Sequence, residues 1–197
     1  MAKMYFRYGA MTCGKTTALL QVAHNYEING MHPFLIKPLI DKKGDDTVVS
    51  RLGISRKVDL LLGPQDLVSN KLDIKDITCI IVDEVQFLNE SQIYELWLIS
   101  KIYDVPVICY GLKTNFKGEL FEGSKALLEK ADEIEELATI CACGKKAKFN
   151  ARGENGEFVF TGKEVAIDGI DATYKPLCGE CYVSKVLKYK IKKVDHK

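Results

Sequence analysis

The sequence predicts an α/β fold in which helices pack against a parallel β-sheet. Segments with strand-like and helix-like patterns alternate up to about residue 138. Two of the strand-like segments, Cys79–Val82 and 105–110, are continuous apolar runs, which is typical of parallel strands that are covered on both faces. A glycine-containing segment, residues 9–17, lies between an apolar run and a helical pattern. These features together indicate a helix-covered parallel sheet with a specialised loop after its first strand.

The elements of the N-terminal part follow from local patterns. Met4–Tyr8 is a strand candidate, and apolar residues then recur at helical spacing from position 18 to position 26. Gly30 supplies a stop for this helix. Residues 33–36 are a short buried-strand candidate, and the polar, glycine-containing run 41–55 predicts a mobile loop or a hairpin.

A second series of strand, helix and strand follows. After the strand at Cys79–Val82, residues 91–103 carry an apolar stripe at helical spacing, and the apolar run 105–110 follows directly. Strands that are separated by helices are the usual sign of parallel pairing. The stripe consists of Ile93, Leu96, Trp97, Ile99 and Ile102.

Composition excludes several classes of protein. The 197 residues suffice for one domain or for one domain with a small appendage. The formal charge of +1 gives no electrostatic case for a nucleic acid or a membrane as partner. No apolar run approaches the roughly 20 residues of a membrane span, and the N-terminus lacks a signal-peptide core. Seven cysteines, an odd number without an export signal, argue against a disulfide framework and favour a cytoplasmic location.

Residues 9–17 have the spacing G-x-x-x-x-G-K-[ST] of a phosphate-binding loop. Glycines let successive backbone N–H groups point inward at a phosphate at the start of a helix. The lysine would reach the terminal phosphates of ATP, and the hydroxyl of the next residue would bind Mg²⁺. The alternative is a glycine-rich turn with an ordinary helical lysine. The candidate nucleotide-binding residues are Gly9, Ala10, Met11, Thr12, Cys13, Gly14, Lys15, Thr16 and Thr17.

A second candidate group directly follows the buried strand Cys79–Val82. An acidic residue at the carboxyl end of a strand, downstream of a phosphate loop, is where Mg²⁺ is usually held, and Asp83 fits that position. Glu84 adjoins it and would take a proton from a hydroxyl group or from water, depending on the acceptor. The alternative is that both carboxylates merely cap the next element.

Two cysteine pairs near the C-terminus suggest a zinc site. Four thiolates in two close pairs can bind Zn²⁺ tetrahedrally, and because the protein fills all four positions the metal would be structural. The first pair has one residue between its cysteines instead of the usual two. The alternative is four free buried thiols. The four candidate ligands are Cys141, Cys143, Cys178 and Cys181.

The segment between the cysteine pairs, residues 144–177, has two interpretations. A segment fixed at both ends by one metal would be able to close over a small ligand and exclude water. Alternatively, residues 157–160 and 164–167 form the plain hairpin of a zinc ribbon. The lysine-rich end, residues 184–197, is most simply a frayed and solvated tail.

Taken together, these motifs resemble the cellular-type (type II) thymidine kinases over nearly the whole chain. The resemblance rests on the loop GAMTCGKT, on Lys37-Pro38 followed by Asp41, and on the Asp-Glu-x-Gln-Phe motif of residues 83–87. It continues through YGLKTNFKGELFEGS at 110–124, the CGKKA motif, and Tyr174 ahead of the second cysteine pair. Each piece is modestly specific, whereas their order and spacing are highly specific.

The resemblance implies a RecA-like P-loop core at 1–138 that binds ATP, and a zinc-binding domain at 139–197 with a lasso-like loop over the nucleoside. It implies transfer of the γ-phosphoryl group of ATP to the 5′-hydroxyl of thymidine or deoxyuridine, giving dTMP and ADP in pyrimidine salvage. It also implies a homotetramer and feedback inhibition by dTTP.

The resemblance further implies roles for individual residues. Glu84 would be the catalytic base, assisted by Lys15, and Lys43 would be a cation that stabilises the transition state. Aromatic rings suit a flat pyrimidine, which gains from stacking and edge contacts. The residues at substrate-binding positions are Met11, Asp41, Gln86, Phe87, Leu112, Phe116, Phe121 and Asn150, together with Val165, Ile167, Gly169 and Tyr174 of the lasso.

Two other functions remain open at this stage. One is a P-loop ATPase with a zinc ribbon that acts on nucleic acid or protein, in which Glu84 would activate water. Such a protein would need a basic face and a sensor arginine, and the balanced charge argues against it. The other is a catalytically silent nucleotide-binding protein, which would bind ATP without acceptor-dependent turnover.

Overall fold

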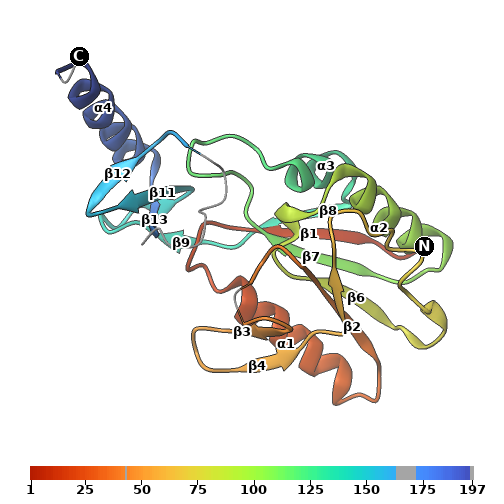
Figure 1. Cartoon of the computed structure of the whole chain (residues 1–197). Helices are drawn as coiled ribbons and strands as arrows, with labels where there is room; N and C mark the ends of the chain where they lie inside the picture. The colour runs from red at the N-terminus through yellow and green to blue at the C-terminus, as the bar shows by residue number, and fades with distance from the viewer. Residues whose placement is uncertain (43, 163–171, 196–197) are drawn as a thin grey trace. The chain divides into compact units, whose positions relative to one another are not determined.

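The computed structural model describes residues 1–42, 44–162 and 172–195, and these form two compact units (Figure 1). Unit 1 comprises residues 1–8, 14–113 and 121–137. Unit 2 comprises residues 9–13 and 114–120 together with the described part of 138–197. The chain therefore passes from one unit to the other within the predicted phosphate loop.

Unit 1 contains a six-stranded sheet of order β5-β2-β6-β7-β1-β8, in which every neighbouring pair is parallel. The prediction of a parallel sheet is thus confirmed. Since β7 lies between β1 and β6, the carboxyl ends of β1 and β6 flank the same strand, at the edge where such sheets bind ligands. The strands are β1 (Met4–Tyr8), β2 (Pro33–Pro38), β5 (Leu60–Leu62), β6 (Cys79–Val82), β7 (Val107–Gly111) and β8 (Glu133–Glu136).

Helices cover both faces of this sheet (Figure 1). Because successive side chains of a strand point to opposite faces, Ile80 and Val82 of β6 pack on one side and Cys79 and Ile81 on the other. The first side is closed by α2 and α3, and the second by α1. The helices are α1 (Lys15–Glu27), α2 (Glu90–Ile102) and α3 (Glu122–Lys130), with short 3-10 turns η1 (Ile74–Asp76) and η2 (Val85–Phe87).

The polar run after β2 contains a hairpin, as one of the two expectations for this run predicted. Strands β3 (Thr47–Val49) and β4 (Ser55–Lys57) pair in antiparallel fashion. Arg56 of β4 forms ion pairs with Glu27 at 2.8 Å and with Asp59 at 3.0 Å. Arg56 thereby connects the hairpin to the end of α1 and to the residue that precedes β5.

Unit 2 is built from small antiparallel sheets and one helix. Strands β9 and β10 pair with each other, and β11 lies between β12 and β13. The elements are β9 (Thr139–Ile140), β10 (Lys146–Ala147), β11 (Phe149–Glu154), β12 (Glu157–Val159), β13 (Ala172–Leu177) and α4 (Gly179–Asp195). The proposed hairpin partner of β12, residues 164–167, lies outside the described residues.

The prediction of a frayed C-terminal tail is wrong, because α4 extends to Asp195. The ring of Tyr182 stacks on Phe149 with centroids 4.7 Å apart, and Tyr189 contacts Phe160 edge-on at 5.7 Å. These tyrosines lie seven positions apart and so share one face of the helix. Their packing stabilises the helix. The helix was not predicted because the segment is rich in lysine, which is typical of a solvated tail.

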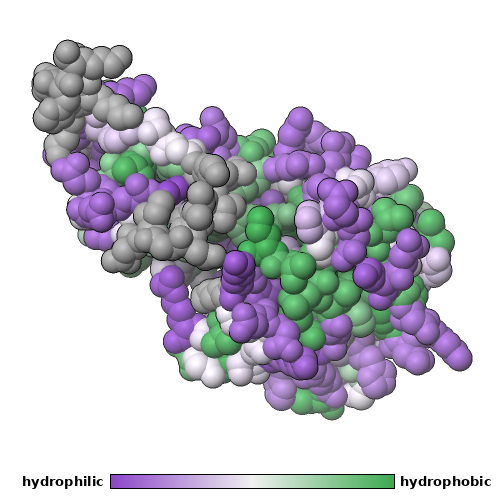
Figure 2. Space-filling view, in the orientation of Figure 1, coloured by the Kyte–Doolittle hydropathy of each residue, from purple (hydrophilic) through white to green (hydrophobic). Residues whose placement is uncertain are grey.

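Hydrophilic and hydrophobic residues both occur on the outer surface. Figure 2 shows hydrophilic residues over much of the face in view, with hydrophobic patches between them, as is normal for a globular protein. Within the described residues, no helix is both long and apolar enough to span a bilayer.

Candidate functional site

The predicted phosphate loop connects β1 to α1. Helix α1 begins at Lys15, and Gly14 before it has φ 83° and ψ 17°. Thr12 also has a positive φ, of 68°. A Cβ atom on Gly14 would meet nothing within 4 Å, so the left-handed backbone, and not lack of space, favours glycine there. The first N–H groups of a helix have no partner within the helix, so a turn of this kind before α1 is suited to an anion.

The end of β6 places a buried carboxylate in the same unit as the start of α1. Asp83 is 5% exposed and Lys15 is 8% exposed. Burial, followed by the negative charges of Glu84 and Asp41, raises the pKa of Asp83 to about 7, while a backbone hydrogen bond and the Lys15 ammonium act in the opposite direction. Lys15 is therefore close enough to affect the charge of Asp83.

The donor set around Asp83 fits a divalent cation. Among the described residues, its buried Oδ1 accepts no hydrogen bond. A buried carboxylate oxygen without a partner is costly unless a cation or a donor binds it. Mg²⁺ prefers oxygen ligands and typically takes one or two carboxylates plus phosphate oxygens. The arrangement of Asp83 is thus chemically suited to a magnesium ion that also contacts a nucleotide.

Glu84 occupies an unusual backbone conformation. Its φ of 45° and ψ of 39° lie in the left-handed region, which a non-glycine residue seldom adopts. Its side chain does not cap η2, so the capping alternative fails for this residue. Instead, Oε2 accepts a hydrogen bond of 2.6 Å from Gln86 Nε2. The strained turn therefore holds a partly exposed carboxylate directly beside Asp83.

Four of the predicted substrate-binding residues surround this turn in unit 1. Phe87 of η2 and Phe121 before α3 make an edge-to-face contact with ring centroids 5.8 Å apart. Leu112, directly after β7, donates its backbone N–H to Gln86 Oε1 at 3.0 Å. The structure thus brings together Gln86, Phe87, Leu112 and Phe121, although they come from three separate segments.

Four further predicted substrate-binding residues belong to unit 2. Asn150 of β11 is buried, and its Oδ1 accepts a hydrogen bond of 2.8 Å from the backbone N–H of Met11. Phe116 is also buried, and its carbonyl accepts a hydrogen bond of 2.8 Å from the Tyr182 hydroxyl. Tyr174 lies half-buried in β13, where burial raises its pKa. The contact of Asn150 explains why the first part of the phosphate loop groups with unit 2.

The site contains a buried lysine that was not among the predicted site residues. Lys37 in β2 is 1% exposed, and its Nζ lies 3.2 Å from Asp41 Oδ2 and donates to the Asp45 carbonyl at 3.0 Å. The signal in the sequence was a lysine at the end of an apolar strand, which needs a partner when it is buried. Lys37 thus fixes the position of the predicted substrate residue Asp41. The predicted residues Lys43, Val165, Ile167 and Gly169 lie outside the described part of the chain.

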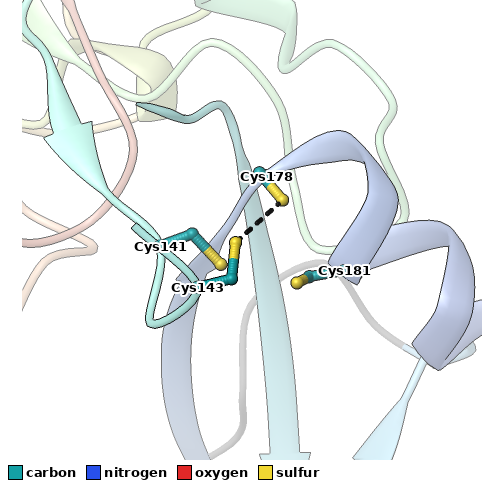
Figure 3. A group of neighbouring side chains, drawn as sticks. All are labelled: Cys141, Cys143, Cys178 and Cys181. Atoms are coloured by element: carbon teal, nitrogen blue, oxygen red, sulfur yellow. Dashed lines mark hydrogen bonds between the residues drawn. The ribbon is translucent and has the colours of Figure 1, made fainter. Parts of the chain in front are cut away.

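The four cysteines of the predicted zinc site come together in unit 2, as predicted (Figure 3). Their Sγ atoms all lie within 4.8 Å of one another, and those of Cys143 and Cys178 are 3.5 Å apart. Four sulfurs at about 2.3 Å from a tetrahedral zinc ion lie roughly 3.8 Å apart, so the cluster has the right size. Gly144, with φ 85°, turns the chain after the short first pair.

The chemistry of the cluster also suits a cation. Backbone N–H groups of Cys143 and Cys178 lower the pKa of Cys141 to about 6, which favours its thiolate. Hydrogen bonds with the three neighbouring cysteines raise the pKa of Cys181 to about 12, because they favour its protonated thiol. A zinc ion would favour the thiolate form of all four cysteines, since its ligands are deprotonated thiolates.

Comparison with known proteins gives a consistent result. The family model for thymidine kinase matches residues 2–182. The thymidine kinase of Pasteurella multocida (strain Pm70) is 43% identical over 191 residues, which cover 94% of this chain and 99% of that protein. The thymidine kinase of Vibrio cholerae serotype O1 is 44% identical over 187 residues, with 92% and 97% covered. That of Francisella tularensis subsp. tularensis is 41% identical, with 90% and 95% covered.

Proposed function

The chain belongs to the thymidine kinase family and is a nucleoside kinase, and from this premise we propose that it transfers the γ-phosphoryl group of ATP to the 5′-hydroxyl of thymidine. The products are dTMP and ADP, and deoxyuridine is a second acceptor.

The assignment of the reacting residues rests on one observation, the cluster of ionisable side chains at the carboxyl end of β6. Asp83 has an unpartnered buried oxygen, Glu84 adjoins it on a strained turn, and Lys15 is near enough to lower the pKa of Asp83. In phosphoryl transfer, the protein chiefly positions the reactants and neutralises charge. A carboxylate pair and a buried lysine supply both requirements in unit 1.

Each residue then has a distinct role. The N–H groups at the start of α1 bind phosphate oxygens, and Lys15 neutralises charge on the terminal phosphates. Asp83 and the Thr16 hydroxyl hold Mg²⁺, which neutralises charge on the phosphates when bound. Glu84 removes the proton of the 5′-hydroxyl as that oxygen attacks the γ-phosphorus in line.

The nucleoside-binding residues follow the family pattern. Phe87 and Phe121 pack against each other in unit 1 and offer aromatic surface to a pyrimidine. Tyr174 lies in β13, which directly follows the segment that the family pattern assigns to a lasso-like loop over the base. Met11, Phe116 and Asn150 belong to the same unit. The loop would read the edge of the base through its backbone N–H and C=O groups.

The remaining features complete the proposal. The cysteine cluster binds one structural Zn²⁺ ion, which anchors both ends of the loop-bearing segment. The protein forms a homotetramer, acts in the cytoplasm, has no nucleic-acid or membrane partner, and is inhibited by its end product dTTP. The division into an ATP-binding domain at 1–138 and a zinc-binding domain at 139–197 belongs to the same proposal.

The decisive experiment measures ADP formation from Mg-ATP by the purified protein with and without thymidine, with cytidine and deoxyadenosine as controls. ADP release that depends on thymidine, with labelled dTMP appearing in step, supports the proposal. Steady hydrolysis that is indifferent to every nucleoside would refute it and favour an ATPase, in which Glu84 activates water.

A further inference from the structure

The side chain of Gln86 is enclosed within unit 1. It is 2% exposed. A residue that lines an open nucleoside pocket would present accessible polar atoms to the ligand. The burial of Gln86 therefore indicates that its amide serves another purpose than direct contact with substrate.

The hydrogen bonds of this amide fix its orientation. The backbone N–H of Leu112 can only donate, so the atom 3.0 Å from it must be the Gln86 oxygen. The amide nitrogen consequently faces Glu84 and donates to Oε2 at 2.6 Å. A carboxylate accepts hydrogen bonds, so this pairing is satisfied in the ionised form of Glu84. Glu84 is partly exposed, so its carboxylate is accessible to the proton of a substrate hydroxyl.

Two glycines, Gly111 and Gly123, allow the backbone to pack closely against the turn that carries Gln86. A Cβ atom on Gly111 would lie 2.5 Å from Gln86 Oε1 and 2.9 Å from Val85 Cγ1. A Cβ atom on Gly123 would lie 2.6 Å from the carbonyl oxygens of Val85 and Leu88. All four distances are shorter than real Cβ atoms make, so β7 and α3 approach η2 as closely as they do because both residues are glycines.

A further hydrogen bond links the backbone of Leu112 to α3. The Ser124 hydroxyl, which is fully buried, donates to the Leu112 carbonyl at 2.6 Å. The peptide groups of Leu112 are therefore held on both sides, by Gln86 through its N–H and by Ser124 through its C=O. This fixes the start of the segment that leads from β7 to Phe121.

We propose that Gln86 is a positioning residue that orients the carboxylate of Glu84 and takes its own position from the backbone of Leu112. This inference rests on the proposed function, because it presupposes that Glu84 accepts the 5′-hydroxyl proton. Leu112 also stands at a substrate-binding position, so the chain from Leu112 through Gln86 to Glu84 connects the nucleoside-binding segment to the base.

The test compares two substitutions of Gln86 in the full-length protein. Gln86→Met removes both hydrogen bonds at nearly constant volume, whereas Gln86→Glu keeps an acceptor for Leu112 and removes the donor to Glu84. A misplaced reacting group lowers turnover by up to about 100-fold, so we expect kcat to fall about 10- to 100-fold in both variants. The KM values for thymidine and ATP should stay within about twofold, because uniform binding is retained.

Gln92→Met is the matched control. Gln92 is a buried glutamine at 1% exposure, and its amide donates to the carbonyls of Gly63 and Asp66 at 2.8 and 3.0 Å. Its loss should lower the melting temperature as much as the loss of Gln86, because both variants remove buried hydrogen bonds. The kcat of the folded Gln92→Met protein should match that of the wild type.

Three outcomes would overturn the inference. A higher KM for thymidine at unchanged kcat in Gln86→Met would mean that the amide contacts the nucleoside. Unchanged kcat and KM in Gln86→Glu, or a loss of kcat in Gln92→Met equal to that in Gln86→Met, would reduce Gln86 to a structural role. A wild-type protein without thymidine-dependent ADP formation would instead refute the proposed function, and the positioning role with it.

Discussion

Replacing Gly123 by alanine tests the close approach of α3 to η2 directly. The added methyl carbon would lie 2.6 Å from each of two backbone carbonyl oxygens, those of Val85 and Leu88. Carbon and oxygen atoms that are not bonded normally stay roughly 3.3 Å apart or more, so α3 must move by about 0.7 Å. Neither oxygen can rotate away, because both belong to the main chain of the turn that follows Glu84.

The expected loss of stability combines two opposing effects. Overpacking of this kind costs typically 1–3 kcal/mol, and the better helix propensity of alanine offsets less than about 1 kcal/mol of it near a helix end. A net loss of about 1–2 kcal/mol lowers the melting temperature by about 2–8 °C in a protein of this size. The same displacement moves Gln86, so kcat should fall as well.

The assay is thermal unfolding followed by far-ultraviolet circular dichroism, with turnover measured on the folded protein. Gly179→Ala is the matched control, because the nearest atom to its added Cβ is Phe149 Cε2 at an ordinary 3.8 Å. The control should melt at or slightly above the wild-type temperature. A melting temperature of Gly123→Ala within about 1 °C of the wild type would refute the reasoning, since α3 could then not be packed against η2 as described.

Three further predictions concern the site residues and the metal. Glu84→Gln should keep nucleotide affinity within about twofold and lose at least about 100-fold in turnover, measured by ATP titration and by ADP release; near wild-type turnover would exclude Glu84 as the base. Lys37→Met should destabilise the protein by about 2 kcal/mol in denaturant unfolding, because Asp41 and the Asp45 carbonyl lose a buried partner; unchanged stability would contradict this pairing. Elemental analysis should find about one zinc per chain, and Cys141→Ser should lower that content and the stability of unit 2; less than about half an equivalent in the wild type would rule out the four-thiolate site.

Local patterns predicted much of the fold. The helix expected at 91–103 forms at Glu90–Ile102, and the apolar run Cys79–Val82 forms a strand buried on both faces. These elements were predictable because periodicity and burial act on residues that are neighbours in the sequence. The C-terminal helix was missed, since its stability comes from tyrosines that pack on β11 and the loop after β12, while lysines dominate its composition.

In the candidate site, too, some features were predictable from local patterns and others were not. Glycine and lysine in the loop before α1, the acidic pair after β6 and the two cysteine pairs were all visible in the sequence, because each motif needs fixed residue types at fixed spacing. Residue types and their spacing were therefore enough to predict the kind of chemistry and the family.

The contacts that support these groups join segments far apart in the sequence and became visible only in the folded protein. The hydrogen bond from Leu112 to Gln86 joins residues 26 positions apart, and that from Met11 to Asn150 joins residues 139 positions apart. Neither has a local pattern, because each partner is brought into place by the packing of separate elements. The same is true of the space that Gly123 leaves beside η2. A residue's type sets which hydrogen bonds it can make, whereas the fold selects the partner that receives them.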